Sequence, residues 1–272
     1  MQRITAAIWY QYVYEMRTIK QLATLHGRSD EWVRTKLQQH PVTMPRQRPR
    51  RVVIVMDVTY FGPWGVLVVI DPNARTERGE NLVLYYAFLE GSERTVHYQT
   101  ALDTLEAMGY TITGATIDGR RGVRELLARQ GIPAQYCQFH QLQTITRCLT
   151  RRPYLLQNRQ LRSIALSIPT TNEADLTAAL DGWYAAYSDW LRQRDHEGRF
   201  MHPRTRRAYF SLRRNLPYLF MYQRATHVSI PNTTNALDGR FGVWKSMLHR
   251  HRGCSRRLKI KILRSLFAEA QR

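Results

Sequence analysis

The spacing of apolar residues along the chain changes between alternate positions and helical intervals, and this change predicts the order of the structural elements. Residues 52–60, "VVIVMDVTY", form a β-branched apolar run that ends at the turn signal "FGPWG". Three strands, a helix, a strand, a helix, a strand and a helix are predicted in that order. The strands are expected at 52–60, 66–71, 81–89, 111–118 and 133–140.

Three sequential strands followed by strands joined through helices predict a mixed five-stranded sheet flanked by helices. This α/β order is typical of a ribonuclease-H-like core, in which the first and fourth strands lie side by side. Asp57 closes the first strand and Asp118 closes the fourth. Such a sheet would bring the two carboxylates within bridging reach of one cation.

Residues 1–41 are predicted to form a small helical domain. Leu22 and Ala23 lie on a short helix, Gly27 supplies a tight turn, and Ser29 is suited to cap the next helix. This spacing is typical of a helix-turn-helix DNA-binding domain, although a plain helical hairpin also fits. In the first interpretation, three basic side chains lie near DNA: Arg28, Arg34 and Lys36.

Three further segments complete the predicted organisation. Residues 42–51 are rich in proline and arginine, so we expect a basic linker rather than a helix or a central strand. Its Arg48 and Arg50 either follow a DNA backbone or are simply solvated. Residues 151–230 have helical apolar spacing and are predicted to form an all-α insertion. Residues 231–272 are assigned to a C-terminal helix of the core and a basic tail.

Charge is distributed unevenly along the chain. Residues 1–50 hold nine basic and three acidic side chains, residues 51–150 hold nine and ten, and residues 151–272 hold 23 and eight. The net charge of +20 therefore belongs to the two flanks, while the strand-rich middle is nearly neutral. A neutral core between basic arms is typical of a nucleic-acid-binding enzyme, and a merely basic, ribosome-associated protein is the alternative.

Cysteine content and hydropathy indicate the compartment. Three cysteines, Cys137, Cys148 and Cys254, define no disulfide framework and favour a reducing environment. No signal peptide is visible, and no apolar run approaches the roughly 20 residues that span a bilayer. We therefore expect a cytoplasmic, nucleoid-associated protein that binds double-stranded DNA and no membrane.

A third acid, Asp238, opens a predicted amphipathic helix within "TTNALDGRFGVWKSMLHRHRG". If that helix packs beside the first strand, Asp57, Asp118 and Asp238 form one set of oxygen ligands. Magnesium prefers oxygen ligands, and two ions about 3.5–4 Å apart activate the attacking oxygen and stabilise the leaving oxygen at phosphorus. The set predicts a site for two Mg²⁺ or Mn²⁺ ions. The structural alternative is that each aspartate caps a helix or complements a helix dipole.

At these motifs the chain resembles the DDE-type transposases of the Mutator-like group, which includes many bacterial insertion-sequence enzymes. The matching stretches are "VIVMDVTYFG", "GATIDGRRGVRELL", "CQFHQLQ" and "PNTTNALDGRFGVWKSMLHRHRG", and the resemblance covers nearly the whole chain. It implies a ribonuclease-H-like catalytic core with an all-α insertion between the second and third acids. It also implies divalent-metal-dependent DNA cleavage and strand transfer at insertion-sequence ends by a homo-oligomer on DNA.

One residue departs from the family pattern. The third acid of that family is usually Glu, whereas this chain has Asp238, whose side chain is one methylene shorter. Two hypotheses follow: an active transposase of DDD type, and a catalytically inactive, transposase-derived DNA-binding protein. A third is a metal nuclease or resolvase of the same fold, which would form no joined strand-transfer products.

The pair Cys137 and His140 resembles half of a zinc site, but the sequence has no second close pair of Cys or His near it. The family resemblance places both residues beside the acids, where His140 would bind a phosphate or order the site. The alternative is a buried cysteine and a partly buried histidine without such a role.

Further basic residues are expected to contact DNA. The tail "HRHRGCSRRLKIKILR" is dense in positive charge, and each phosphate that it neutralises adds about 0.9 to the salt slope of affinity. A solvated basic surface is the alternative. The candidates are Arg120, beside the second acid, and Lys245, Arg250, Arg252, Arg256 and Arg257.

Overall fold

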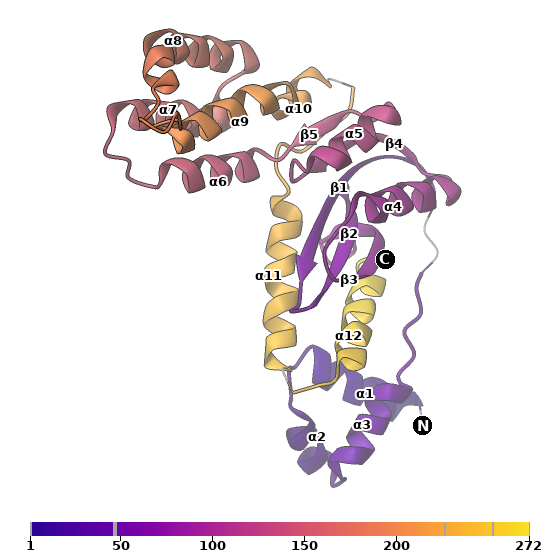
Figure 1. The fold of residues 1–272 in the computed structure, drawn as a ribbon. Helices are drawn as coiled ribbons and strands as arrows, with labels where there is room; N and C mark the ends of the chain where they lie inside the picture. Colours follow the sequence, from indigo (N-terminus) through magenta and orange to yellow (C-terminus); the bar gives the residue numbers. More distant parts are fainter. Residues whose placement is uncertain (1, 46–47, 226, 252, 272) are drawn as a thin grey trace.

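The computed structural model describes residues 2–45, 48–225, 227–251 and 253–271. Figure 1 shows three groups of elements: three N-terminal helices, a central sheet with its covering helices, and a group of helices next to β5. Two C-terminal helices, α11 (Asn235–Arg250) and α12 (Arg256–Glu269), connect the sheet with the N-terminal helices. Within the described ranges, no helix is both long and apolar enough to cross a membrane.

The sheet contains five strands in the order β3-β2-β1-β4-β5. Their bounds are β1 (Arg51–Tyr60), β2 (Trp64–Arg75), β3 (Asn81–Glu90), β4 (Thr111–Ile117) and β5 (Ala134–Tyr136). The first three are antiparallel neighbours, and β4 and β5 continue the sheet parallel to β1. The expected mixed α/β sheet is confirmed, and its strand order is compatible with a ribonuclease-H-like core.

The two faces of the sheet are covered by different helices, because successive side chains of a strand point to opposite sides. Ile54 packs against α4 (Thr95–Ala107) and α5 (Arg121–Arg129), which join the parallel strands. Val55 and Val66 point to the other face and share a core with α11 and α12. A side chain on the Val55 face of β1 therefore points toward the C-terminal helices.

The fifth strand is shorter than the sequence predicts. β5 ends at Tyr136 and α6 begins at Gln138, so Cys137 and His140 lie at the start of a helix rather than on a strand. The reason is that the Gln138 N–H leaves the sheet and donates to the carbonyl of Asn232 (2.9 Å). β2 is longer than predicted: it runs from Trp64 to Arg75, whereas the predicted strand covers 66–71.

A group of helices follows the sheet. It consists of α6 (Gln138–Leu149), α7 (Leu156–Leu166), α8 (Glu173–Arg192), α9 (Pro203–Leu219) and α10 (Met221–Arg224), with a 3₁₀ turn at Ile168–Thr170. These helices have a core of their own, which includes Leu161, Leu180, Trp183 and Leu212. The chain then returns to the sheet, where the Thr116 hydroxyl donates to the Pro231 carbonyl (2.6 Å). This return holds the segment just before α11 beside β4.

The N-terminal group consists of α1 (Gln2–Val13), α2 (Ile19–His26) and α3 (Asp30–Gln39). The predicted turn and cap are confirmed: Gly27 has a left-handed φ of 59°, and the Ser29 side chain accepts a hydrogen bond from the backbone of α3. These helices share the hydrophobic core of α11 and α12. The indole of Trp9 donates to the Ser265 hydroxyl (3.1 Å), which ties α1 to α12.

Candidate active site

The two strand-end acids lie close together because of the register between β1 and β4. Val55 pairs with Thr116 in this parallel ladder. The same offset places Asp57 level with Asp118, which directly follows β4. Alternation along β1 turns Asp57 to the Val55 face, toward α11. Asp57 is only 8% exposed, and its carboxylate accepts a hydrogen bond from the next backbone N–H (2.7 Å).

Helix α11 brings the third acid to the same face of the sheet. The helix is amphipathic as predicted, and its buried apolar stripe includes Leu237, Phe241, Trp244 and Leu248. The stripe belongs to the core that contains Val55 of β1. Asp238 lies in the first turn of the helix, beside this stripe, and is half-buried. Packing of the apolar stripe therefore decides where the third carboxylate lies.

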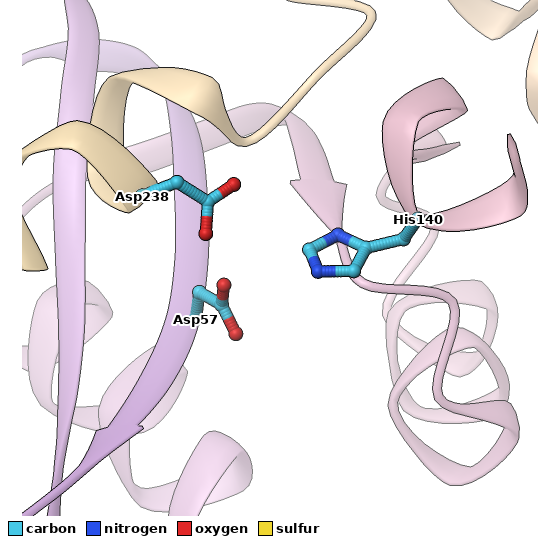
Figure 2. Close-up of side chains that lie close together, drawn as sticks. All are labelled: Asp57, His140 and Asp238. Carbon is cyan, nitrogen blue, oxygen red and sulfur yellow. The ribbon is translucent and has the colours of Figure 1, made fainter. Parts of the chain in front are cut away.

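The three acids line one cleft of about 440 Å³, whose other polar lining residues include His140, Glu93 and Lys245. Figure 2 shows the carboxylates of Asp57 and Asp238 close together, with the His140 imidazole facing them from α6. One ligand atom from each of these three residues lies within 4.8 Å of the others. Among the described residues, Asp118 is not part of this close group, although it lines the same cleft.

A threonine that the sequence analysis did not single out connects the site residues. The Thr234 hydroxyl oxygen lies 3.2 Å from a carboxylate oxygen of Asp238, 3.4 Å from Nδ1 of His140 and 3.4 Å from Sγ of Cys137. Thr234 is completely buried. The one hydroxyl proton can be donated to the Asp238 carboxylate or to Sγ of Cys137, while a lone pair can accept from a protonated Nδ1 of His140. Thr234 therefore fixes α11 and α6 relative to each other at the cleft.

The acids and the histidine influence each other's protonation. Burial raises the pKa of Asp57 to about 7, and the negative charge of Asp118 adds to this effect. The hydrogen bond to Cys137 raises the pKa of His140 to about 9, with further contributions from Asp57 and Asp238. Burial opposes ionisation of the Cys137 thiol, but hydrogen bonds with His140 and Thr234 outweigh it and lower the thiol pKa. A cation bound in the cleft would relieve the repulsion between the Asp57 and Asp118 carboxylates.

A fourth carboxylate, Glu93, also lines the cleft and was missed by the sequence analysis. It forms an ion pair with Arg120, and its other oxygen accepts a hydrogen bond from the Tyr98 hydroxyl (3.1 Å). Arg120 was expected to contact DNA, but its charge is compensated within the chain. The backbone N–H of residue 120 also donates to the Asp118 carboxylate (3.2 Å), so the turn itself holds the second acid. Glu93 precedes α4, away from any acid motif, and no sequence signal marked it.

Several of the expected DNA-contacting residues are exposed. Arg28 and Arg34 are exposed on the N-terminal helices, and Arg28 and Lys36 lie 5.8 and 5.7 Å from the ring centre of Trp32. Lys245 is exposed where α11 lines the cleft. Arg48, Arg250 and Arg257 are also exposed, and none of the ion pairs between described residues involves them.

Two other candidates are paired with acids, and one is not described. Arg50 forms an ion pair of 2.7 Å with the buried Asp71. Arg256 pairs with Glu90 and lies 5.6 Å from the ring centre of Trp64. These contacts anchor the linker and α12 to the sheet, which reduces the charge that either arginine offers to DNA. Arg252 lies outside the described residues.

We expect the substitution Thr234→Val to lower both stability and activity. It keeps the shape of the side chain but removes the hydroxyl that joins Asp238 and His140, at a cost of about 1–2 kcal/mol in the free energy of unfolding. Thermal denaturation measures the first effect, and a strand-cleavage assay measures the second if the site acts on DNA. The control is Thr233→Val, one residue earlier, and Thr234→Ser should restore both. Unchanged cleavage by Thr234→Val would show that the hydroxyl does not position the site.

Comparisons with known proteins add little. No protein-family model matches the chain, and no curated protein matches it. Among solved structures, the chain is similar to part of a cryo-EM structure of the simian T-cell lymphotropic virus intasome in complex with the PP2A regulatory subunit B56 gamma. The match has 13% sequence identity, covers 75% of this chain and 68% of that chain, and has a TM-score of 0.24. At that TM-score the likeness carries no weight for function.

Proposed function

We propose that this protein is a metal-dependent DNA transposase that cleaves DNA strands at insertion-sequence ends and joins them to target DNA. One observation carries the proposal: carboxylates from β1, the end of β4 and the start of α11 line a single cleft in a chain with a net charge of +20. Phosphodiester chemistry requires concentrated oxygen ligands for a cation, and the basic flanks supply attraction for the polyanionic substrate.

The donor set fits a divalent cation. Asp57 and Asp238 offer two carboxylates, and His140 offers an imidazole nitrogen once a bound cation has displaced its proton; one ligand atom of each lies within 4.8 Å of the others, and Asp118 lines the cleft beside them. Carboxylate oxygens suit Mg²⁺ and Mn²⁺, and the imidazole is better matched to Mn²⁺. Bound in this cleft, a divalent ion would polarise the phosphodiester and stabilise negative charge as it develops on the leaving oxygen.

In the proposed cleavage step, a water oxygen forms a bond to phosphorus as the bond from phosphorus to the 3′ oxygen breaks. The water proton ends on the 3′ oxygen, which leaves a 3′ hydroxyl and a 5′ phosphate. In strand transfer, the 3′ hydroxyl oxygen attacks a phosphorus of target DNA and displaces another 3′ oxygen. Lys245, two turns after Asp238 and exposed at the cleft, is placed to hold a phosphate of either strand.

The proposal also assigns functions to the N-terminal helices and to the helical group after the sheet. Helices α1 to α3 act as the helix-turn-helix module that recognises the element end, and α7 to α10 correspond to the all-α insertion of the Mutator-like group. Two copies would hold the two element ends together. The shorter Asp238 serves in place of the usual Glu, because Thr234 and the packing of α11 hold its carboxylate beside Asp57.

The decisive test of the proposal is strand cleavage and joining on the element's own end sequence. We expect activity of the wild type in Mg²⁺ and Mn²⁺, none in chelator, and none for Asp238→Asn. Asp238→Glu adds one methylene within the cleft and should retain part of the activity. If only Asp238→Glu is active, the natural protein has lost its catalytic activity through the shorter third acid. Cleavage without joined products would instead indicate a metal nuclease.

The second candidate is a DNA-binding protein without catalysis. It is favoured by the position of Asp118, which lines the cleft but lies outside the close group formed by Asp57, His140 and Asp238. This alternative predicts sequence-selective DNA binding that persists in chelator, together with no cleavage by the wild type or by either Asp238 variant. The same set of proteins therefore separates the two functions.

A further inference from the structure

A second cleft, of about 690 Å³, opens on the other side of the turn that carries Asp118. We call it the basic cleft, and its lining includes Gly119, Arg121, Arg124, Arg214 and Tyr218. It lies between α5, which follows the second acid, and α9 of the helical group. Gly119 lines this cleft while its neighbour Asp118 lines the acidic one, so a single turn separates the two.

Arg124 is the central residue of the basic cleft. It is only 9% exposed, and its guanidinium lies over the Tyr218 ring, 4.6 Å from the ring centre. One terminal nitrogen donates a hydrogen bond of 2.8 Å to the side-chain oxygen of Asn215. Its Nε is buried and has no hydrogen-bond partner among the described residues. A buried donor without a partner is costly, so Arg124 is held here at a free-energy cost that its packing and its hydrogen bond to Asn215 must offset.

A network of buried amides holds Arg124 in place. Asn215 donates to the side-chain oxygen of Gln141 (2.8 Å), and Gln141 in turn donates to the Ser211 hydroxyl (3.3 Å). The network links α5, α6 and α9, and Gln141 lies one residue after His140 of the candidate active site. The orientation of Arg124 is therefore fixed before any ligand binds.

The charges around Arg124 favour an anion. No carboxylate forms an ion pair with Arg124 in the described part of the chain, and burying an uncompensated cation is unfavourable. The one acid that lines the cleft, Glu125, already pairs with Arg121 (2.7 Å). Arg214 is exposed and contributes to no ion pair between described residues. Three arginines and one paired glutamate leave an excess of positive charge.

We propose that the basic cleft binds the phosphodiester backbone of the DNA strand that enters the active site, at a phosphate next to the one being cleaved. The guanidinium fork of arginine matches the geometry of phosphate oxygens, and Arg124 is already oriented for it. A strand that crosses the Gly119 turn places one phosphate at the acids and a neighbouring phosphate at the arginines. This inference deepens the proposed function and rests on it.

The test compares two double variants that remove equal charge from the same two helices. Arg121→Gln with Arg214→Gln removes two arginines of the basic cleft. Arg129→Gln with Arg213→Gln removes two that do not line it. Affinity for a labelled 30-base-pair duplex is measured in chelator over a range of salt concentrations. Each phosphate contact contributes about 0.9 to the salt slope of affinity, so the cleft variant should lose about 1–2 in slope relative to the control.

Equal slopes for the two double variants would overturn the proposal. Loss of slope by the cleft variant supports it, provided that both proteins melt at the wild-type temperature. Adenosine monophosphate provides a second arm: if it binds the wild type in a cleft-dependent manner while the duplex slopes are equal, the cleft serves a free nucleotide instead. Because binding is measured without metal, failure of the proposed function appears separately, as absent cleavage by the wild type.

Discussion

Replacing Asp57 by Asn is expected to make the metal-free protein more stable at pH 8 and to abolish DNA cleavage. The carboxylate is almost fully buried, and burial together with Asp118 raises its pKa from 3.8 to about 7. Asparagine keeps the oxygen that accepts the Val58 N–H but carries no charge. At about 1.4 kcal/mol per pKa unit, burying the ionised carboxylate costs a few kcal/mol of folding free energy at pH 8, and the asparagine variant avoids this cost.

The sign of the pH dependence follows from the two protonation states. Between pH 3.8 and about 7, folded Asp57 retains a proton that the unfolded chain has released, so stability falls as the pH rises through this window. His140, whose pKa is raised to about 9, is a base that also loses a stabilising proton as the pH rises from 6.5 through 9. Both groups therefore make the metal-free protein less stable in mild alkali, and Asp57→Asn removes one contribution.

Thermal unfolding in chelator at pH 5 and pH 8 measures the stability of wild type and Asp57→Asn. The variant should show the smaller loss between the two pH values. Divalent metal should raise the melting temperature of the wild type at pH 8 and leave that of Asp57→Asn nearly unchanged. Cleavage should fall by about a thousandfold, because each tenfold corresponds to about 1.36 kcal/mol and loss of metal binding costs several kcal/mol. A variant that cleaves at the wild-type rate would refute the assignment of Asp57.

Replacing Gly119 by Ala is expected to disrupt the site through the backbone. Gly119 has a φ of +88°, and a Cβ at this position would lie 2.1 Å from the Tyr136 ring. The left-handed backbone costs an alanine about 1–2 kcal/mol, and overpacking adds about 1–3 kcal/mol. A shift of the turn to relieve the clash would move Asp118 and the edge of the basic cleft together. We expect a melting temperature roughly 5–15 °C lower, and loss of most cleavage activity.

Gly131→Ala is the matched control for this prediction. Gly131 has a φ of +68°, but a Cβ there would have no heavy atom within 4 Å. It therefore carries the backbone strain without the clash, and it lies after α5, away from the acids. Gly131→Ala should cost about 1–2 kcal/mol and leave cleavage unchanged. If the two variants behave alike, close packing of Tyr136 does not hold the Asp118 turn.

The sequence was sufficient to predict the sheet and to point to the acids. β-branched runs and turn signals identified β1 to β4, and the strand order that they implied placed Asp57 level with Asp118. The apolar stripe of α11 was equally readable, because its residues recur at helical spacing. These features follow from the local spacing of hydrophobic residues, which can be seen in a single sequence.

Hydrophobic periodicity does not reveal the long-range contacts that assemble the site. Thr234 meets His140 and Cys137 only because the chain returns to the sheet after the whole group α6 to α10. The basic cleft likewise joins Arg124 of α5 to Asn215 of α9 through side-chain hydrogen bonds. The end of β5 was misplaced because a backbone hydrogen bond to Asn232, distant in sequence, competes with the strand ladder.

The C-terminal end of α11 and the neighbouring helix α12 are both packed against the N-terminal helices. His251, which follows α11, is buried and stacks on Tyr12 of α1 (4.1 Å between ring centres), while Lys261 of α12 donates to the carbonyls of Leu37 and Gln38 at the end of α3. The sixteen residues of α11 are about 24 Å long, the rise of roughly seven base pairs. If α1 to α3 bind DNA as proposed, the length of α11 would set the interval between the bound sequence and the cut, and inserting residues into the 42–51 linker should leave that interval unchanged.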